Sequence, residues 1–129
     1  MRSQKNLFVA TALIEVGAGL ALVSLPALAI KVLLGVADPS PEALIVSRVG
    51  GAGILALAVA CWLGRDDRGR GSQHGLLWAA LVYNIGACSV LTLAGLGLSP
   101  AGVALWPVVA LHGALTIWCA LNLSGSAAR

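Results

Sequence analysis

The sequence has few charged residues, and this shortage excludes an ordinary soluble domain. Only 10% of the 129 residues are Asp, Glu, Lys or Arg, whereas 59% are hydrophobic. Soluble globular domains carry roughly 25% charged residues. The net charge of +3 resides in short segments between apolar runs, without the basic, aromatic-rich surface that nucleic-acid binding requires. The composition predicts a protein whose solvent is the lipid bilayer and which has no nucleic-acid partner.

Motifs for metals, cofactors and covalent chemistry are also lacking. The three cysteines include no C-x-x-C pair, and neither histidine has a second histidine four residues away. His74 and His112 are expected at different membrane depths, which disfavours paired axial ligation of a haem. There is no phosphate-binding glycine loop, nucleophile elbow or metalloprotease motif. We therefore assign no catalytic residue and no metal site, leave the cofactor unknown, and disfavour an enzyme.

What the sequence does contain is four long apolar runs. A hydrocarbon core about 30 Å thick requires about 20 residues of helix, and none of the runs alternates as a transmembrane β-strand would. Prolines and charged residues separate the runs, with a tight turn predicted at Ser99-Pro100. The pattern predicts an all-α membrane protein, a single-domain antiparallel four-helix transmembrane bundle. Its expected spans are residues 7–25, 43–63, 75–98 and 101–121.

The first run resembles a secretion signal, because a basic start precedes it and Ala27-Leu28-Ala29 resembles a cleavage site. We favour a retained first helix, since the run exceeds the length of a signal core and contains Glu15. After Pro26, residues 27–35 are typical of a short helix in the outer interface, followed by a loop to Pro41.

Lys and Arg residues are distributed unequally between the two predicted membrane faces. Lys31 and Arg48 belong to one face. The other face has Arg2, Lys5, Arg65, Arg68, Arg70 and Arg129. The positive-inside rule therefore predicts an N-in/C-in topology, with both termini in the cytoplasm. The expected positions of the tryptophans agree with aromatic belts at the headgroups. These are Trp62, Trp78 and Trp118 near the cytoplasmic face, and Trp106 near the other.

Several polar side chains are predicted at membrane depth. Counting helical rise from the cytoplasmic boundary puts four of them in one layer, roughly 12 to 15 Å deep. These four are Glu15, Tyr83, Asn84 and His112. Arg48 is expected roughly 8 to 10 Å higher, from where it would reach either Glu15 or the headgroups. Ionisable groups in a span are costly and face the bundle interior by default.

This layer has two interpretations that the sequence leaves open. It can be a hydrogen-bonded core that fixes which helices pair, or it can be a functional site. As a site, Glu15, Arg48, Tyr83, Asn84 and His112 are candidates for binding a ligand or relaying protons. A carboxylic acid at mid-membrane and an imidazole nearby make proton exchange chemically feasible.

Six short segments of the chain form a recognisable pattern. They are Glu15-Val16-Gly17-Ala18-Gly19, Ser47-Arg48-Val49-Gly50-Gly51, Ala60-Cys61-Trp62, Tyr83-Asn84, Leu105-Trp106-Pro107 and Leu111-His112. The pattern resembles a group of small bacterial four-helix membrane proteins and is similar, more loosely, to the DoxX-like proteins. The resemblance covers most of the chain. It implies the bacterial inner membrane, and it carries over no activity.

Ala12-Leu13-Ile14-Glu15-Val16 also resembles the glutamate-bearing first helix of the small multidrug resistance transporters. The chain departs from that family in lacking an aromatic-rich third helix and in having Arg48, whose charge would oppose a cationic substrate. Our first hypothesis is a binding or accessory membrane protein that holds a small lipid-like ligand or a membrane protein partner. The alternative is a proton-coupled transporter that uses Glu15.

Overall fold

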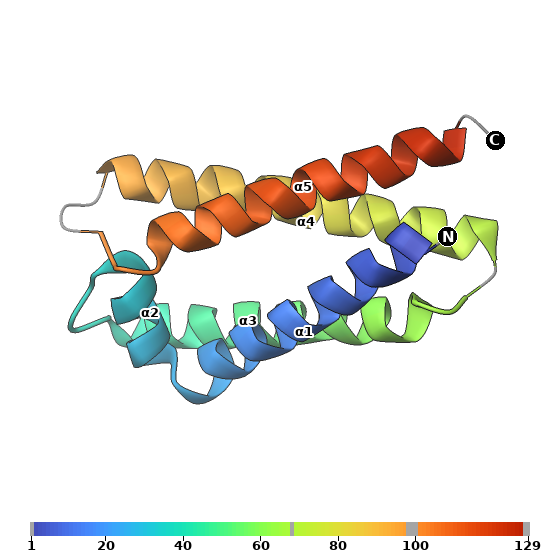
Figure 1. Ribbon diagram of the computed structural model, residues 1–129. Coiled ribbons are helices and arrows are strands. Elements are labelled where there is room, and N and C mark those ends of the chain that lie inside the picture. The colour runs from blue at the N-terminus through green and yellow to red at the C-terminus, as the bar shows by residue number, and fades with distance from the viewer. Residues whose placement is uncertain (1, 68, 98–100, 128–129) are drawn as a thin grey trace.

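The computed structural model describes residues 2–67, 69–97 and 101–127. These residues form five α-helices (Figure 1). The helices are α1 (Arg2–Ser24), α2 (Pro26–Leu34), α3 (Pro41–Gly64), α4 (Arg70–Gly97) and α5 (Leu105–Ala127).

Four of the described helices are long and apolar enough to cross a membrane, which confirms the four predicted apolar helices. The candidate spans are Ser3–Ser24, Pro41–Gly64, Gly71–Gly97 and Leu105–Gly125. Large apolar side chains lie on their outer faces, and Leu63 and Leu96 are 72% and 74% exposed. So much exposed apolar surface is unfavourable in water and favourable in lipid. The fold therefore indicates a multi-pass membrane protein.

The short helix expected over residues 27–35 is confirmed as α2. Pro26 occupies its first turn, where a missing N–H breaks no helical hydrogen bond. Gly35 ends the helix in the left-handed conformation (φ 77°), and its N–H donates to the carbonyl of Lys31 at 2.9 Å. Ser40 then caps α3 by accepting a hydrogen bond from the N–H of Ala43.

Helices α1 and α3 lie side by side and cross at two glycines. A Cβ added to Gly19 would lie 2.9 Å from the carbonyl oxygen of Gly51, and a Cβ added to Gly51 would lie 2.9 Å from that of Gly19. Membrane helices approach this closely only where small residues leave the backbone uncovered. The two glycines therefore set the spacing of this pair.

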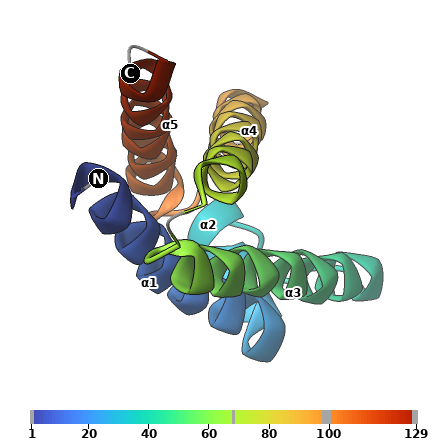
Figure 2. The same cartoon turned by 90° about the vertical axis from the view of Figure 1, so that its right-hand side faces the viewer.

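Helices α4 and α5 form a second pair, and Figure 2 shows the two pairs as separate layers when viewed from one end. The thiol of Cys88 on α4 donates to the carbonyl of Val109 on α5 at 3.7 Å. Helix α2 contacts α1, α3 and α5, and it therefore packs against both pairs. Its Pro26 and Ile30 are buried.

The apolar core is concentrated at one end of the bundle. Figure 1 shows that α1 begins, α5 ends and α3 connects to α4 at this end. All four long helices contribute to it. The buried cluster consists of Leu7, Phe8, Ala12, Cys61, Leu77, Ala80, Leu115, Cys119 and Leu123.

Helix α5 begins at Leu105, whereas the sequence predicts a span from Ala101. The intervening backbone contacts α2 instead of forming a helix. The N–H of Ala104 donates to the carbonyl of Val32 at 3.0 Å, and a Cβ added to Gly102 would lie 2.2 Å from that oxygen. This tertiary contact explains why α5 begins later in the chain than the sequence predicts. The turn predicted at Ser99-Pro100 lies outside the described residues.

Candidate functional site

Glu15 of α1 is buried between the two helix pairs, with 1% of its surface exposed. Its Oε2 accepts a hydrogen bond from the hydroxyl of Tyr83 on α4 at 3.1 Å. Its Oε1 is buried and has no hydrogen-bond partner among the described residues. One carboxyl oxygen of Glu15 therefore has a hydrogen-bond partner, and the other has none among the described residues.

Thr11 lies one helical turn before Glu15, on the same face of α1. It is fully buried, and its Oγ1 also lacks a hydrogen-bond partner within the described chain. A buried polar group without a partner costs about 1–3 kcal/mol. Two such atoms thus lie on neighbouring turns of one helix.

Asn84 and His112 connect α4 to α5 close to the same layer. The Asn84 amide nitrogen donates to the carbonyl of Ala80 at 2.7 Å, which orients its Oδ1 as the acceptor. Nδ1 of His112 lies 2.8 Å from that Oδ1. Because an amide oxygen only accepts, Nδ1 carries the proton, and Nε2 of a neutral ring remains an acceptor.

Tyr83 contacts both Glu15 and His112. Its ring meets that of His112 edge to face, with centroids 5.6 Å apart and planes at 80°, while its hydroxyl reaches Glu15. We call Glu15, Tyr83, Asn84 and His112 the polar cluster. The structure brings together the four residues that the sequence assigns to one layer, and the contacts cross from α1 to α4 and from α4 to α5.

Arg48 is not part of the polar cluster. No ion pair joins it to Glu15 in the described part of the chain, and the residue is exposed. Its Nε donates to the carbonyl of Val23 at 3.3 Å, near the end of α1. Cations are favourable beside the free carbonyls of a helix C-terminus. Of the two positions that the sequence left open for Arg48, one beside Glu15 and one at the headgroups, the structure contains no bond between Arg48 and Glu15.

Ser47 has a similar structural role that sequence reasoning missed. Its hydroxyl donates to the carbonyl of Leu22 at 3.4 Å. That carbonyl would ordinarily accept from the N–H four residues later, but this residue is Pro26, which has none. The spacing between Leu22 and Pro26 is a signal that could have predicted a missing donor, although not which residue supplies it.

His74 lies apart from the polar cluster, near the start of α4. Its Nε2 accepts a hydrogen bond from the indole N–H of Trp78 at 3.0 Å. No group of three His, Cys, Asp or Glu side chains in the described ranges is placed to hold a metal ion.

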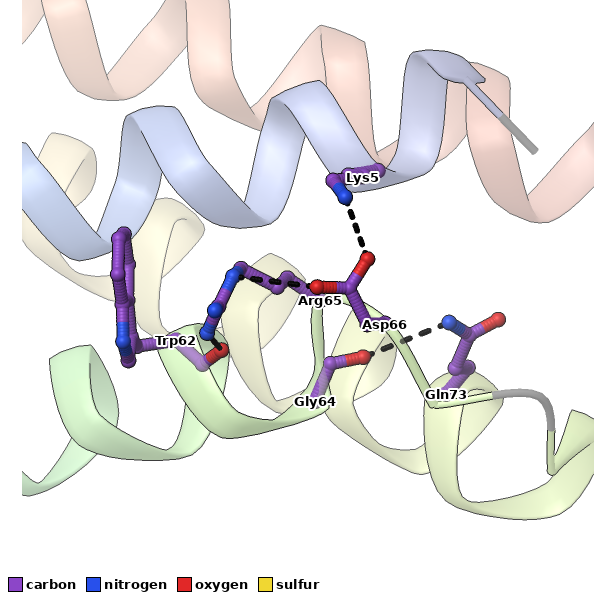
Figure 3. Close-up of polar contacts among 6 residues, drawn as sticks. All are labelled: Lys5, Trp62, Gly64, Arg65, Asp66 and Gln73. Atoms are coloured by element: carbon purple, nitrogen blue, oxygen red, sulfur yellow. Dashed lines mark hydrogen bonds and ion pairs between the residues drawn. The ribbon is translucent and has the colours of Figure 1, made fainter.

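The connection between α3 and α4 holds a network of charged and polar groups (Figure 3). Lys5 and Arg65 both form ion pairs with Asp66, and Arg65 also donates to the carbonyl of Trp62. The hydrogen bond from Lys5 holds the pKa of Asp66 below its usual range, and the charges of Lys5 and Arg65 act in the same direction. Gln73 donates to the carbonyl of Gly64 at 3.4 Å. These contacts tie the start of α1 to the connection.

Comparison of the chain with protein-family models, curated proteins and solved structures found no match.

Proposed function

We propose that this protein is a ligand-binding protein or an accessory subunit in a membrane. Its polar cluster would bind the polar end of a small lipid-like molecule or a polar side chain of a membrane protein partner. The observation that supports this most directly is the pair of buried, unpartnered atoms, Oε1 of Glu15 and Oγ1 of Thr11. A purely structural core would be more stable with both atoms hydrogen-bonded.

The chemistry of these atoms defines the group that would bind. A carboxylate oxygen accepts hydrogen bonds, and a threonine hydroxyl both donates and accepts. A ligand hydroxyl or amine could donate a hydrogen bond to Oε1 of Glu15 and form a second hydrogen bond with Oγ1 of Thr11. Its remaining surface must be apolar, because the helices around the polar cluster present apolar residues to the bilayer.

The membrane setting belongs to the same proposal. We place the chain in the bacterial inner membrane as an antiparallel bundle with both termini cytoplasmic. Lys5 and Arg65 lie at the end where α1 begins, whereas Lys31 belongs to α2, near the opposite end in Figure 1. This supports the positive-inside assignment, and the DoxX-like resemblance supports the bacterial membrane. Labelling single cysteines at positions 4 and 37 from each side of sealed vesicles would test the orientation.

Native mass spectrometry of the protein in mild detergent tests the binding proposal. Wild type is compared with Glu15→Gln and Thr11→Val, and Glu42→Gln is the matched control because Glu42 is an exposed glutamate in the first turn of α3. We expect an additional mass on wild type and Glu42→Gln that is reduced in both cluster variants. If all four proteins are bare and equally well folded, the proposal is wrong.

The second candidate function is a proton-coupled transporter with Glu15 as the proton carrier. The supporting observation is that Tyr83 contacts both Glu15 and His112, so that groups able to exchange protons lie next to one another. In vesicles with an imposed pH gradient, an enclosed pH-sensitive dye reports proton uptake. Uptake that is lost in Glu15→Gln and kept in Glu42→Gln would favour transport, and equal uptake in both variants would contradict it.

A further inference from the structure

An open groove of about 340 Å³ runs between α1 and α3 on the outside of the bundle. Its lining is almost wholly apolar. Ala12 and Ala58 are buried and form its floor, while Leu13, Val59 and Leu63 are more than half exposed and form its walls. The small alanine side chains leave the groove open, and its walls lie on the outer surface of the bundle. In a membrane, hydrocarbon chains surround this surface.

The groove ends at an aromatic and cationic pair. Trp62 lines it, and the guanidinium carbon of Arg65 lies 3.9 Å from the centroid of the Trp62 ring. Tryptophan is enriched at headgroup level in membrane proteins. The groove therefore extends from headgroup depth toward the middle of the membrane, as a lipid tail does.

This end has a positive excess in the sequence, because Lys5, Arg65, Arg68 and Arg70 outnumber Asp66 and Asp67. Figure 3 shows Arg65 between Trp62 and the contact of Lys5 with Asp66, so two cations share one carboxylate. The neighbouring Asp67 accepts hydrogen bonds from Gly69 and Ser72 within the connection. Arginine has five N–H donors, and the contacts of Arg65 with Asp66 and Trp62 use Nε and Nη1. Arginine binds phosphate oxygens well because its donors form a planar fork.

We propose that this groove binds one anionic phospholipid of the surrounding membrane, with an acyl chain along Ala12 and Ala58 and the phosphate held by Arg65 and Lys5. The site is separate from the polar cluster and independent of the function proposed for it. Glu15→Gln should therefore leave the phospholipid bound.

The test is native mass spectrometry of the full chain with added dioleoyl phosphatidylglycerol or dioleoyl phosphatidylcholine. We expect one phosphatidylglycerol per chain, bound more tightly than phosphatidylcholine. Arg65→Gln should weaken phosphatidylglycerol about fivefold, since a basic residue near an anionic surface contributes about 1 kcal/mol. Lys31→Gln, which removes one positive charge from α2, should have no effect.

Filling the groove provides the second variant. Val59→Phe should reduce binding of both lipids, whereas Val82→Phe, at a similarly exposed valine of α4, should not. Both positions face outward, so both variants should fold. Equal binding of the two lipids that neither Arg65→Gln nor Val59→Phe changes would overturn the proposal. So would a mass of two chains that Val59→Phe abolishes, because the groove would then be covered by a second copy.

Discussion

The two helix pairs hold together by different means. Helices α1 and α3 approach closely at Gly19 and Gly51, where a Cβ added to either glycine would lie 2.9 Å from the carbonyl oxygen of the other. Helices α4 and α5 instead meet through side-chain hydrogen bonds, with the Asn84–His112 contact at their centre. At its closest approach the first pair depends on shape, and Ser47 and Arg48 add hydrogen bonds from α3 to carbonyls near the end of α1. The second pair depends on a hydrogen bond between two buried side chains. A substitution that adds volume at the glycines should therefore damage the first pair most, and a substitution that removes a buried donor or acceptor should damage the second pair most.

The largest expected effect breaks the first pair. Gly51→Val adds a Cβ that would lie 2.8 Å from the Cβ of Leu22 and 2.9 Å from the Gly19 oxygen, so α1 and α3 must separate. We expect a loss of about 3 kcal/mol in the free energy of unfolding, measured by titration with a denaturing detergent. Gly50→Val is the control, because its Cβ would have no neighbour within 4 Å. Equal losses for the two variants would refute close backbone contact.

The second pair should respond to removal of a buried partner. Asn84→Leu leaves the Nδ1 proton of His112 without its acceptor, and we expect a loss of about 0.6 to 1.7 kcal/mol. The double variant Asn84→Leu/His112→Leu should cost less than the sum of the two single variants, because no buried donor remains. The same detergent titration measures all three. Strict additivity would show that the bond contributes nothing to the pair.

A smaller effect is expected at the end of α1. Ser47→Ala removes the donor to the Leu22 carbonyl, at a cost of about 0.5 kcal/mol. Pro26→Ala would restore a backbone N–H to that carbonyl, so the cost of Ser47→Ala should shrink in the Pro26→Ala background. A cost that is unchanged in that background would mean that Ser47 acts through some other contact.

The smallest effect concerns the connection between α3 and α4. Because Lys5 depresses the pKa of Asp66 in the folded state, the contact stabilises the fold above the unfolded pKa of about 3.9 and is lost as the pH falls through the lower folded value. Both side chains are about half exposed, so the effect is small. Melting temperatures of wild type and Asp66→Asn should differ slightly at pH 7, and the difference should shrink as the pH falls below about 3.9. A constant difference would contradict this assignment.

The sequence predicted the long helices because lipid forces each backbone segment to satisfy its own hydrogen bonds. It also predicted the common depth of Glu15 and Tyr83, since helical rise alone fixes depth. It could not predict that α5 begins at Leu105, because the contact of Ala104 with α2 depends on how distant segments pack. Local pattern contains no information about that packing.

Arg48 shows the same limit within the candidate site. Its depth left two positions open, and the choice between them depends on helix rotation and on the free carbonyls beside it. Thr11 illustrates the converse. Thr11 precedes Glu15 by four residues, a spacing that places both on one helix face, yet only the three-dimensional packing shows that its hydroxyl lacks a partner among the described residues.

The hydrogen bond between Tyr83 and Glu15 has a consequence for biosynthesis. The two residues are 68 positions apart, and the chain is made from its N-terminus. Glu15 therefore enters the membrane before the ribosome has made its partner, at a cost of a few kcal/mol for a charged carboxylate. Until α4 is made, the nascent α1 must be sheltered, neutralised by a proton, or retained at the translocon. Stable insertion of α1 in the bilayer therefore depends on the later arrival of α4.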